Sequence, residues 1–412
     1  DPEWHADVAT TYSSPTHAFG SSATVTFGSS RVGLLMNVTG RRVNTLRPAG
    51  GIDSHAAVTR FLGLSSGVFG EDRLPDTAFT QYGGTIHANV AVAPEHQLVV
   101  HYQRSQQDGG KRYDQLLGGD GNLVADLRNL MLDFGYVRYD AQWAGLFDRV
   151  SATVSFNGQR EERVNQGGNG NPLSPITSQF ERTNVLGLSG YAARRFGERN
   201  TLLVGGDLYR ERVDTPAHTF NPATGSATPS RPRVPDDARY LSYGVYVQDS
   251  ADLLDKRLHL SGALRFGVAS YRSRAVSSPV VRGAPLWPDD SLRVDDLAGR
   301  FGVVVRPWEP VGFSFNYSRG FRAPDVTELG TLGLTGDGFE VAAADVGDLG
   351  GTIGVALGDE IVSSGRPVAQ LRSERSDNYE VGLRLDFDRV RVSASGYLID
   401  LEDTHTKQPL LL

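Results

Sequence analysis

The chain has 412 residues, 48 glycines, no cysteine and a net charge of −7 at pH 7. The lack of cysteine excludes disulfide scaffolds, thiolate metal sites, iron–sulfur clusters and cysteine nucleophiles. The negative charge argues against nucleic acid as the main partner, and no run approaches the roughly 18 apolar residues of a membrane-spanning helix. The length alone suggests two or three domains. A mean hydropathy of −0.30 still permits a membrane β-barrel, because its strands alternate apolar and polar residues.

Apolar and polar residues alternate along most of the chain, which is typical of strands with one apolar and one polar face. No segment of similar length repeats with helical periodicity, so we predict an all-β chain. The alternation predicts about fifteen strands, in chain order 4–12, 18–28, 31–43, 77–92, 96–107, 127–140, 148–163, 178–195, 201–213, 238–251, 257–274, 294–306, 311–323, 374–387 and 389–403.

The predicted strand 257–274 illustrates the pattern. Leu264 and Phe266 lie on one face, and His259 and Arg265 lie on the other. Many of these strands exceed the five or six residues that are usual in globular sheets, and they fit the roughly nine to eleven residues that cross a bilayer at a tilt. In a membrane barrel the apolar face points outward, whereas in a soluble barrel it forms the core.

The connections between the predicted strands alternate between two lengths. The short ones are 28–30, 93–95, 196–200, 252–256, 307–310 and 386–389, and the long ones are 44–76, 108–126, 164–177, 214–237, 275–293 and 324–373. A meander with tight turns at one end and large loops at the other is the layout of outer-membrane barrels. The long loops are rich in Gly, Pro, Asn and Asp, so we expect irregular, exposed backbone there.

Aromatic residues lie near the ends of several predicted strands. They could form an interfacial girdle, and ordinary packing explains them equally well; they are Tyr139, Tyr209, Tyr271, Trp308 and Tyr317.

Four stretches between residues 240 and 403 resemble motifs of the TonB-dependent outer-membrane receptors. Residues 317–329 resemble the Phe-Arg-Ala-Pro box with its downstream Glu-Leu, here Phe321, Arg322, Ala323, Pro324, Glu328 and Leu329. Residues 371–382 resemble the strand motif L-x-x-E-x-S-x-x-Y-E-x-G, here with Glu374, Tyr379, Glu380 and Gly382. Residues 397–403 resemble the strand that follows, and 246–249 with 260–266 resemble an upstream hairpin of the family.

The resemblance implies an antiparallel transmembrane β-barrel of 22 strands with long extracellular loops, filled by an N-terminal plug domain. It also implies a bacterial outer-membrane location and energised import of a bound ligand. The partners would be outer-membrane lipid, a small-molecule or oligosaccharide ligand, and the TonB complex, which acts through the plug; the complete barrel would be a monomer. With about fifteen strands and no plug, residues 1–412 are expected to be one incomplete barrel domain with two unpaired edges.

We find no catalytic constellation in the sequence. The nine histidines show no His-x-x-x-His spacing, and no Gly-x-Ser-x-Gly elbow lies between a strand and a helix. We therefore predict no enzymatic activity, no cofactor and no metal site, and we expect the family-motif residues to be structural.

The long predicted loop 324–373 is the candidate ligand contact. Between Pro324 and Gln370 it carries eight acidic residues against a single base, Arg366. Such a loop could attract a cationic ligand or bind Ca²⁺ through carboxylates, although a hydrated surface loop is the favoured interpretation. The candidate ligand residues are Asp337, Glu340, Asp345, Asp348, Asp359 and Glu360. Residues 325–370 contain no histidine and no Asn-Pro-x-Leu box, which argues against haem transport.

Three functions remain open from the sequence. The leading hypothesis is a receptor that imports a scarce ligand, such as a ferric siderophore, cobalamin or an oligosaccharide, with TonB-supplied energy. The second is a passive outer-membrane porin or structural β-barrel, which would lack a plug domain. The third is a soluble secreted β-protein with its apolar face inward, which would need no detergent for solubility.

Overall fold

The fold is taken from a computed structural model. It describes residues 2–47, 77–110, 123–167, 171–330, 333–335, 338–341, 343–346, 349–357, 360–406 and 408–412.

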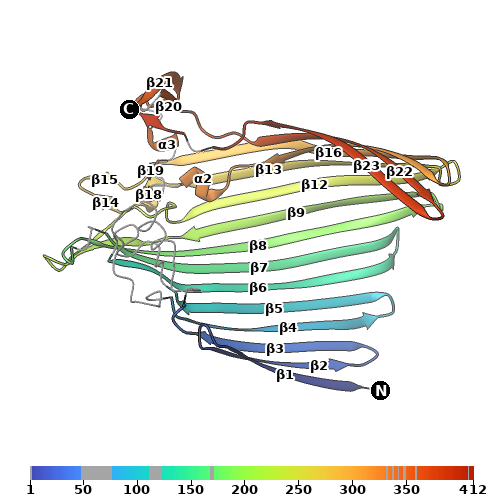
Figure 1. The fold of residues 1–412 in the computed structure, drawn as a ribbon, viewed down its shortest axis with the longest axis horizontal. Helices are drawn as coiled ribbons and strands as arrows, with labels where there is room; N and C mark the ends of the chain where they lie inside the picture. Colours follow the sequence, from blue (N-terminus) through green and yellow to red (C-terminus); the bar gives the residue numbers. More distant parts are fainter. Residues whose placement is uncertain are drawn as a thin grey trace.

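Fifteen long strands follow one another across the molecule, with tight turns at one end and long connections at the other (Figure 1). They are β1 (Glu3–Ser13), β2 (Ala18–Gly28), β3 (Val32–Val43), β4 (Phe79–Ala93), β5 (His96–Gly109), β6 (Val124–Ala144), β7 (Phe147–Gln166), β8 (Ile176–Phe196), β9 (Asn200–Asp214), β12 (Ala238–Leu253), β13 (Leu258–Ser273), β16 (Asp290–Trp308), β17 (Val311–Arg322), β22 (Glu374–Phe387) and β23 (Val390–Glu402). Each predicted strand is confirmed with its ends within a few residues.

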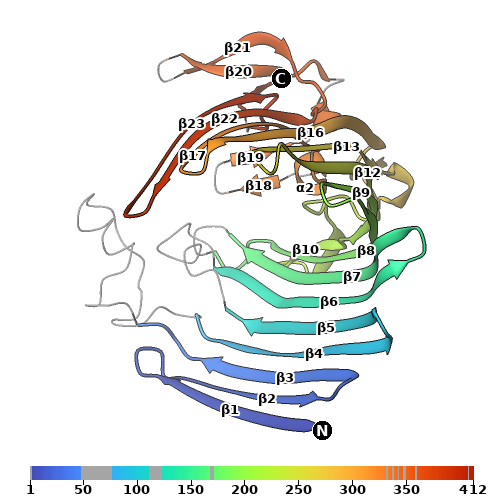
Figure 2. The same ribbon diagram turned by 90° about the vertical axis from the view of Figure 1, so that its right-hand side faces the viewer.

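Each long strand pairs antiparallel with the next long strand along the chain, so the sheet is one continuous meander. Figure 2 shows that this sheet curls around an interior and has an open side. Among the described strands, β1 pairs only with β2 and β23 only with β22, so these two strands are the edges of the sheet.

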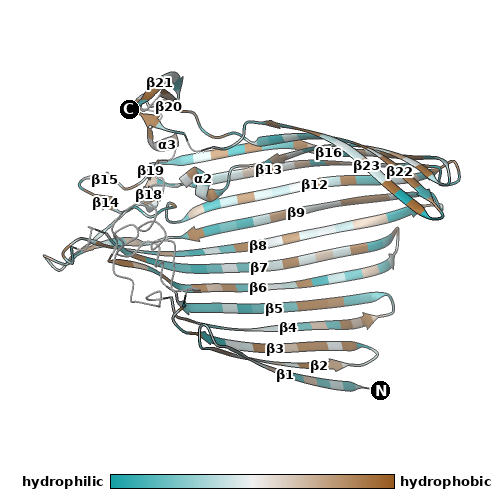
Figure 3. Cartoon of the chain, in the orientation of Figure 1, coloured by the Kyte–Doolittle hydropathy of each residue, from teal (hydrophilic) through white to brown (hydrophobic). Residues whose placement is uncertain are grey.

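The apolar face of the sheet points outward. On β13, Leu264 and Phe266 are 54% and 44% exposed, whereas Arg265 between them turns inward and binds Asp207. Figure 3 shows apolar segments in the middle and turn-side parts of the strands and more polar segments toward the loop end. The hypothesis of a soluble β-protein with an apolar interior is therefore wrong, because the exposed outer wall is the apolar one.

The long connections contain more regular structure than expected. Two short strands, β10 (Ala217–Asn221) and β11 (Ser226–Pro229), extend the sheet from β8, so that it has 17 strands in all. The further elements are η3 (Ala275–Ser277), β14 (Val280–Val281), β15 (Ala284–Pro285), α2 (Val326–Gly330), β18 (Gly333–Thr335), β19 (Gly338–Glu340), α3 (Ala343–Val346), β20 (Thr352–Leu357), β21 (Glu360–Pro367) and β24 (Leu410–Leu411). Elements this short leave no readable periodicity in the sequence.

Among the residues that the structure describes, no helix has the length and apolar character to span a bilayer.

For two of the five aromatics near strand ends, the structure favours ordinary packing over an interfacial girdle. Tyr209 alternates with the outward Leu208 and lies beside Gly187 on the inner face. Tyr271 is 2% exposed and belongs to an inner cluster with Val213, Val234, Ala238, Val326 and Leu329. This cluster packs α2 against the inside of the wall at the loop end. The ring of Tyr271 is therefore buried in the interior, although the residue lies near the end of a strand.

Candidate functional site

The Phe-Arg-Ala-Pro box lies where β17 leaves the sheet at the loop end. Pro324 is fully buried, and its carbonyl oxygen accepts a 2.9 Å hydrogen bond from the Tyr240 hydroxyl on β12. Leu329 is 2% exposed in the inner cluster, and the ring of Phe321 covers Gly267, where an added Cβ would lie 2.7 Å from it. Ala323 is partly buried between them. The box therefore anchors the loop to the inner wall.

Asp325 and Glu328 form a reciprocal cap on α2. The Glu328 backbone amide donates to Asp325 Oδ1, and the Asp325 amide donates to Glu328 Oε2, each at 2.9 Å. This is the arrangement of a capping box, with an acid at the N-cap and Glu three residues later. The sequence Asp-Val-Thr-Glu carries that signal, and our sequence analysis did not use it.

Arg322 joins the two family motifs. Its Nη atoms donate to both carboxylate oxygens of Glu328 at 2.9 and 2.8 Å, and its Nε donates to Glu374 at 2.5 Å. A bidentate guanidinium–carboxylate pair fixes both distance and plane. Glu328 begins the loop and Glu374 ends it, so one side chain closes the base of the 323–373 connection.

His405 completes this arginine cluster from the far side. Its Nε2 lies 2.6 Å from the Arg372 carbonyl oxygen and therefore donates, which leaves Nδ1 to accept from Arg322 at 2.9 Å. Its backbone amide donates to Glu374. No sequence signal marks His405, because it lies outside every motif that resembles the family.

The charges around Glu328 set its protonation. Burial by itself would raise the pKa of the Glu328 carboxyl. The hydrogen bonds from Arg322 and from the Asp325 amide outweigh that effect and lower the pKa below its ordinary value. The carboxylate is therefore the stable form near neutral pH, as the bidentate pair requires.

The remaining motif residues on β22 support the wall. Tyr379 is on the outer face, with its ring centroid 5.1 Å from that of Tyr317. Glu380 pairs with Asn316 on the inner face. An added Cβ at Gly382 would lie 2.4 Å from Ser314 Oγ on the inner face, so a side chain here would require the Ser314 hydroxyl to turn aside.

The acidic loop residues can be placed only in part. Asp337, Asp348 and Asp359 lie outside the described residues. Glu340 ends β19 and Asp345 lies in α3, in both cases with only the backbone described. Glu360 begins β21 and is exposed. Of the six acids, only Glu360 has its side chain among the described residues, so cation binding by the loop stays a prediction.

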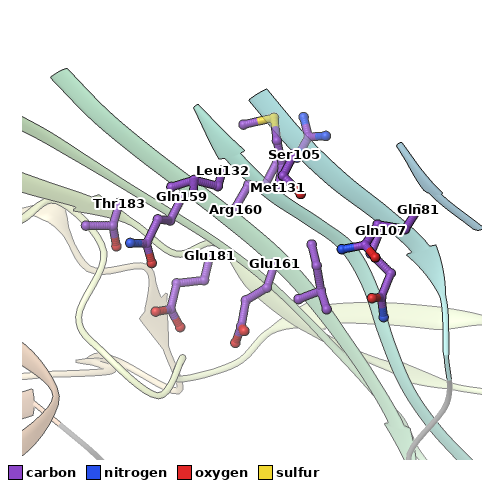
Figure 4. Close-up of a pocket in the computed structure, with 11 residues that line it drawn as sticks. Gln81, Ser105, Gln107, Met131, Leu132, Gln159, Arg160, Glu161, Glu181 and Thr183 are labelled. Atoms are coloured by element: carbon purple, nitrogen blue, oxygen red, sulfur yellow. The ribbon is translucent and has the colours of Figure 1, made fainter. Parts of the chain in front are cut away.

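A polar cavity of about 480 Å³ lies on β4–β8 toward the loop end (Figure 4). Glu161 and Glu181 are cross-strand partners in it, and Gln159 with Thr183 forms the neighbouring pair. Two amides and a hydroxyl also line it, from Gln81, Gln107 and Ser105, together with Leu130 and Leu132. No motif in the sequence marks this cavity, although each strand's alternation assigns most of these residues to the polar face.

A β-bulge borders this cavity. The register of β6 against β7 shifts between Arg128 and Met131, and Asn129 there has φ of 53°. Asn129 is held by a 2.7 Å hydrogen bond from its side-chain nitrogen to Glu162. Bulges redirect side chains next to binding sites, and this one places Leu130 and Leu132 in the cavity lining.

An antiparallel meander with an apolar outer wall, a polar interior and loops gathered at one end defines a membrane β-barrel wall. The sequence model of the TonB dependent receptor-like β-barrel matches residues 6–411. The chain therefore belongs to the TonB-dependent receptor β-barrel family, whose members are bacterial outer-membrane receptors and transporters.

Solved structures of such receptors share the fold. They include the copper transporter OprC (TM-score 0.66, 14% identity, 97% of this chain and 55% of that one). The FrpB iron transporter from Neisseria meningitidis (F3-3 variant) gives 0.61, 14%, 97% and 54%, and the ferric citrate transporter FecA gives 0.59, 12%, 99% and 54%. The chain spans about half the length of these proteins. A search of curated proteins returns no significant match.

Proposed function

We propose that the chain forms part of the barrel wall of an outer-membrane receptor that binds a scarce ligand and imports it with energy from TonB. The observation that carries this proposal is the polar cavity on the wall toward the loop end. A ligand captured by loops on the outside would meet this surface on entering the barrel. On this proposal the edges β1 and β23 pair with further strands of the complete receptor, whose relatives are nearly twice as long.

The lining of the cavity favours a polar ligand with many hydrogen-bonding groups. Gln81, Gln107 and Gln159 each offer a donor and an acceptor, and Glu161 and Glu181 are acceptors when ionised. Siderophores, cobalamin and oligosaccharides all carry such groups. Among these ligand classes, a metal–siderophore complex is the closest to the iron and copper named for the structural relatives.

Energised import separates this proposal from a passive porin or a structural barrel. The complete receptor would be expressed in a host that lacks its own uptake system, and accumulation of candidate radiolabelled ligands would be measured. We expect uptake to stop when tonB is deleted or the proton-motive force is collapsed. Uptake that continues under both conditions would indicate the passive barrel.

The cavity itself can be tested by substitution. We expect Gln159→Ala with Glu181→Gln to weaken ligand binding about 5- to 150-fold, because two lost hydrogen bonds of about 0.5–1.5 kcal/mol each sum to about 1–3 kcal/mol. Gln103→Ala is the matched control, since Gln103 pairs with Phe134 on the same face of the wall but lies outside the cavity lining. Equal binding by both variants would remove the cavity from the ligand site.

A further inference from the structure

Seven arginines lie on the outer face of neighbouring strands near the loop end. We call them the arginine belt: Arg160 on β7, which also borders the cavity of Figure 4, Arg182 on β8, Arg210 and Arg212 on β9, Arg239 on β12, Arg272 on β13 and Arg293 on β16.

Strand alternation assigns the belt to the outer face. Arg210 and Arg212 follow Leu208, which is exposed on the apolar wall, at two-residue steps. Arg272 follows the exposed Phe266 in the same way. Residues on opposite parity, such as Val213 and Tyr271, lie in the inner cluster instead. The belt therefore borders the apolar wall on its loop side.

The register brings arginines directly opposite one another. Arg160 pairs with Arg182, and Arg239 is the cross-strand partner of both Arg212 and Arg272. Like charges in directly opposed positions destabilise a sheet. Three such pairs along the belt need negative charge nearby to offset their repulsion.

The acids of the chain offset only part of this charge. Asp237 binds Arg212 at 3.1 Å and Arg239 at 3.2 Å, and Asp214 also binds Arg212 at 3.1 Å. In the described part of the chain, Arg182, Arg210 and Arg272 have no hydrogen bond or ion pair through their side chains. The enclosed Nε of Arg160 likewise has no hydrogen-bond partner there.

We propose that the arginine belt binds the phosphate groups of an anionic, phosphorylated glycolipid in the outer leaflet of the membrane. Guanidinium groups pair with phosphate in a planar, bidentate geometry. Arg210 lies two residues, or about 7 Å, beyond the apolar Leu208 along β9, which matches the step from acyl chains to headgroup. This inference rests on the outer-membrane location proposed above.

The test uses the complete receptor, purified in an uncharged maltoside detergent. Its thermal unfolding is followed as lipid A with two phosphates is added to the micelles, with phosphatidylcholine and with inorganic phosphate as separate arms. We expect a saturable rise in unfolding temperature with lipid A alone, because a ligand that binds only the folded state stabilises it. A protein or peptide partner would leave all three arms flat.

The decisive variant combines Arg182→Gln, Arg210→Gln and Arg272→Gln, which leaves the ion pairs of Asp237 and Asp214 in place. In lipid-free detergent it should unfold at the same temperature as the unaltered receptor or slightly higher, because like-charge repulsion is relieved. It should lose most of the rise that lipid A causes. The triple lysine variant should keep most of it, and Arg300→Gln, whose side chain binds Gln248, should keep all of it.

Three results would overturn the proposal: an unchanged lipid A effect in the triple glutamine variant, an equal effect of phosphatidylcholine, or an equal effect of inorganic phosphate. Energised uptake by the same preparations, measured in cells, keeps the two proposals apart. Uptake without lipid binding would refute only the belt, and lipid binding without uptake would refute only the import function.

Discussion

Arg322 on β17 and Glu374 on β22 are direct cross-strand partners, and Arg322 Nε donates to Glu374 at 2.5 Å. The same guanidinium also donates two hydrogen bonds to the Glu328 carboxylate in α2. Two family motifs that stand 52 residues apart in the sequence thus meet in one ion-pair cluster. The geometry explains why the box and the strand motif occur together: each supplies one side of the clamp at the base of a long loop.

The clamp predicts the effect of removing its cation. Arg322→Met should destabilise the receptor by about 1–2 kcal/mol, because it leaves two carboxylates together without their partner. Solvent keeps this cost small, because the Arg322 side chain is 47% exposed and its charge is screened. Limited proteolysis should show faster cleavage within 323–373. Arg319→Met, which removes only a 4.0 Å ion pair to Asp377, is the control and should leave that cleavage unchanged.

The lowered pKa of Glu328 predicts a pH dependence at the base of the loop. A carboxyl whose folded pKa lies below its unfolded value, about 4.3, contributes stability that is complete above that value. That stability is lost as the pH falls through the folded pKa. Hydrogen exchange of α2 should therefore be slow and constant from neutral pH to about 5, after correction for intrinsic rates, and should accelerate below about 4.3.

Glu328→Gln provides the comparison for this pH dependence. The variant should exchange faster than the unaltered receptor at neutral pH and should show a weaker acid transition. An acid transition of the same size in both proteins would assign the effect to another group.

The capping box predicts a graded response at Asp325. Asp325→Ala should cost about 1 kcal/mol, because the Glu328 amide loses its acceptor. Asp325→Asn keeps an acceptor oxygen and should cost only a few tenths of that. Equilibrium unfolding of the receptor in detergent measures both. If the alanine variant proved as stable as the asparagine variant, the cap would not hold α2.

Close backbone contact predicts an intolerant glycine in the wall. An added Cβ at Gly83 on β4 would lie 2.4 Å from the carbonyl oxygen of Arg104, and a backbone atom cannot step aside cheaply. Gly83→Ala should therefore destabilise by about 1–3 kcal/mol. Gly40→Ala on neighbouring β3 has nothing within 4 Å of the new atom and serves as the control. Similar unfolding temperatures for the two variants would contradict the expected clash.

Alternation alone predicted the long strands because each has one lipid-facing and one interior face. Leu264, Arg265 and Phe266 show why: the bilayer and the interior demand opposite chemistry at a two-residue period. The same rule failed inside the long connections. Elements such as α2 and β10 are held by contacts with the wall, for instance Leu329 against Tyr271, which leave no local pattern.

The sequence by itself determined the β class, the order and approximate ends of the strands, the two-ended loop layout and the family. These follow from local periodicity and from short motifs. Only the tertiary structure decided which residues meet across strands: His405 with Arg322, Glu161 with Glu181, and Arg239 with Arg212 and Arg272. The reason is register, because strand pairing joins residues that are distant in the chain, and the offset between strands is set by turns and bulges rather than by composition.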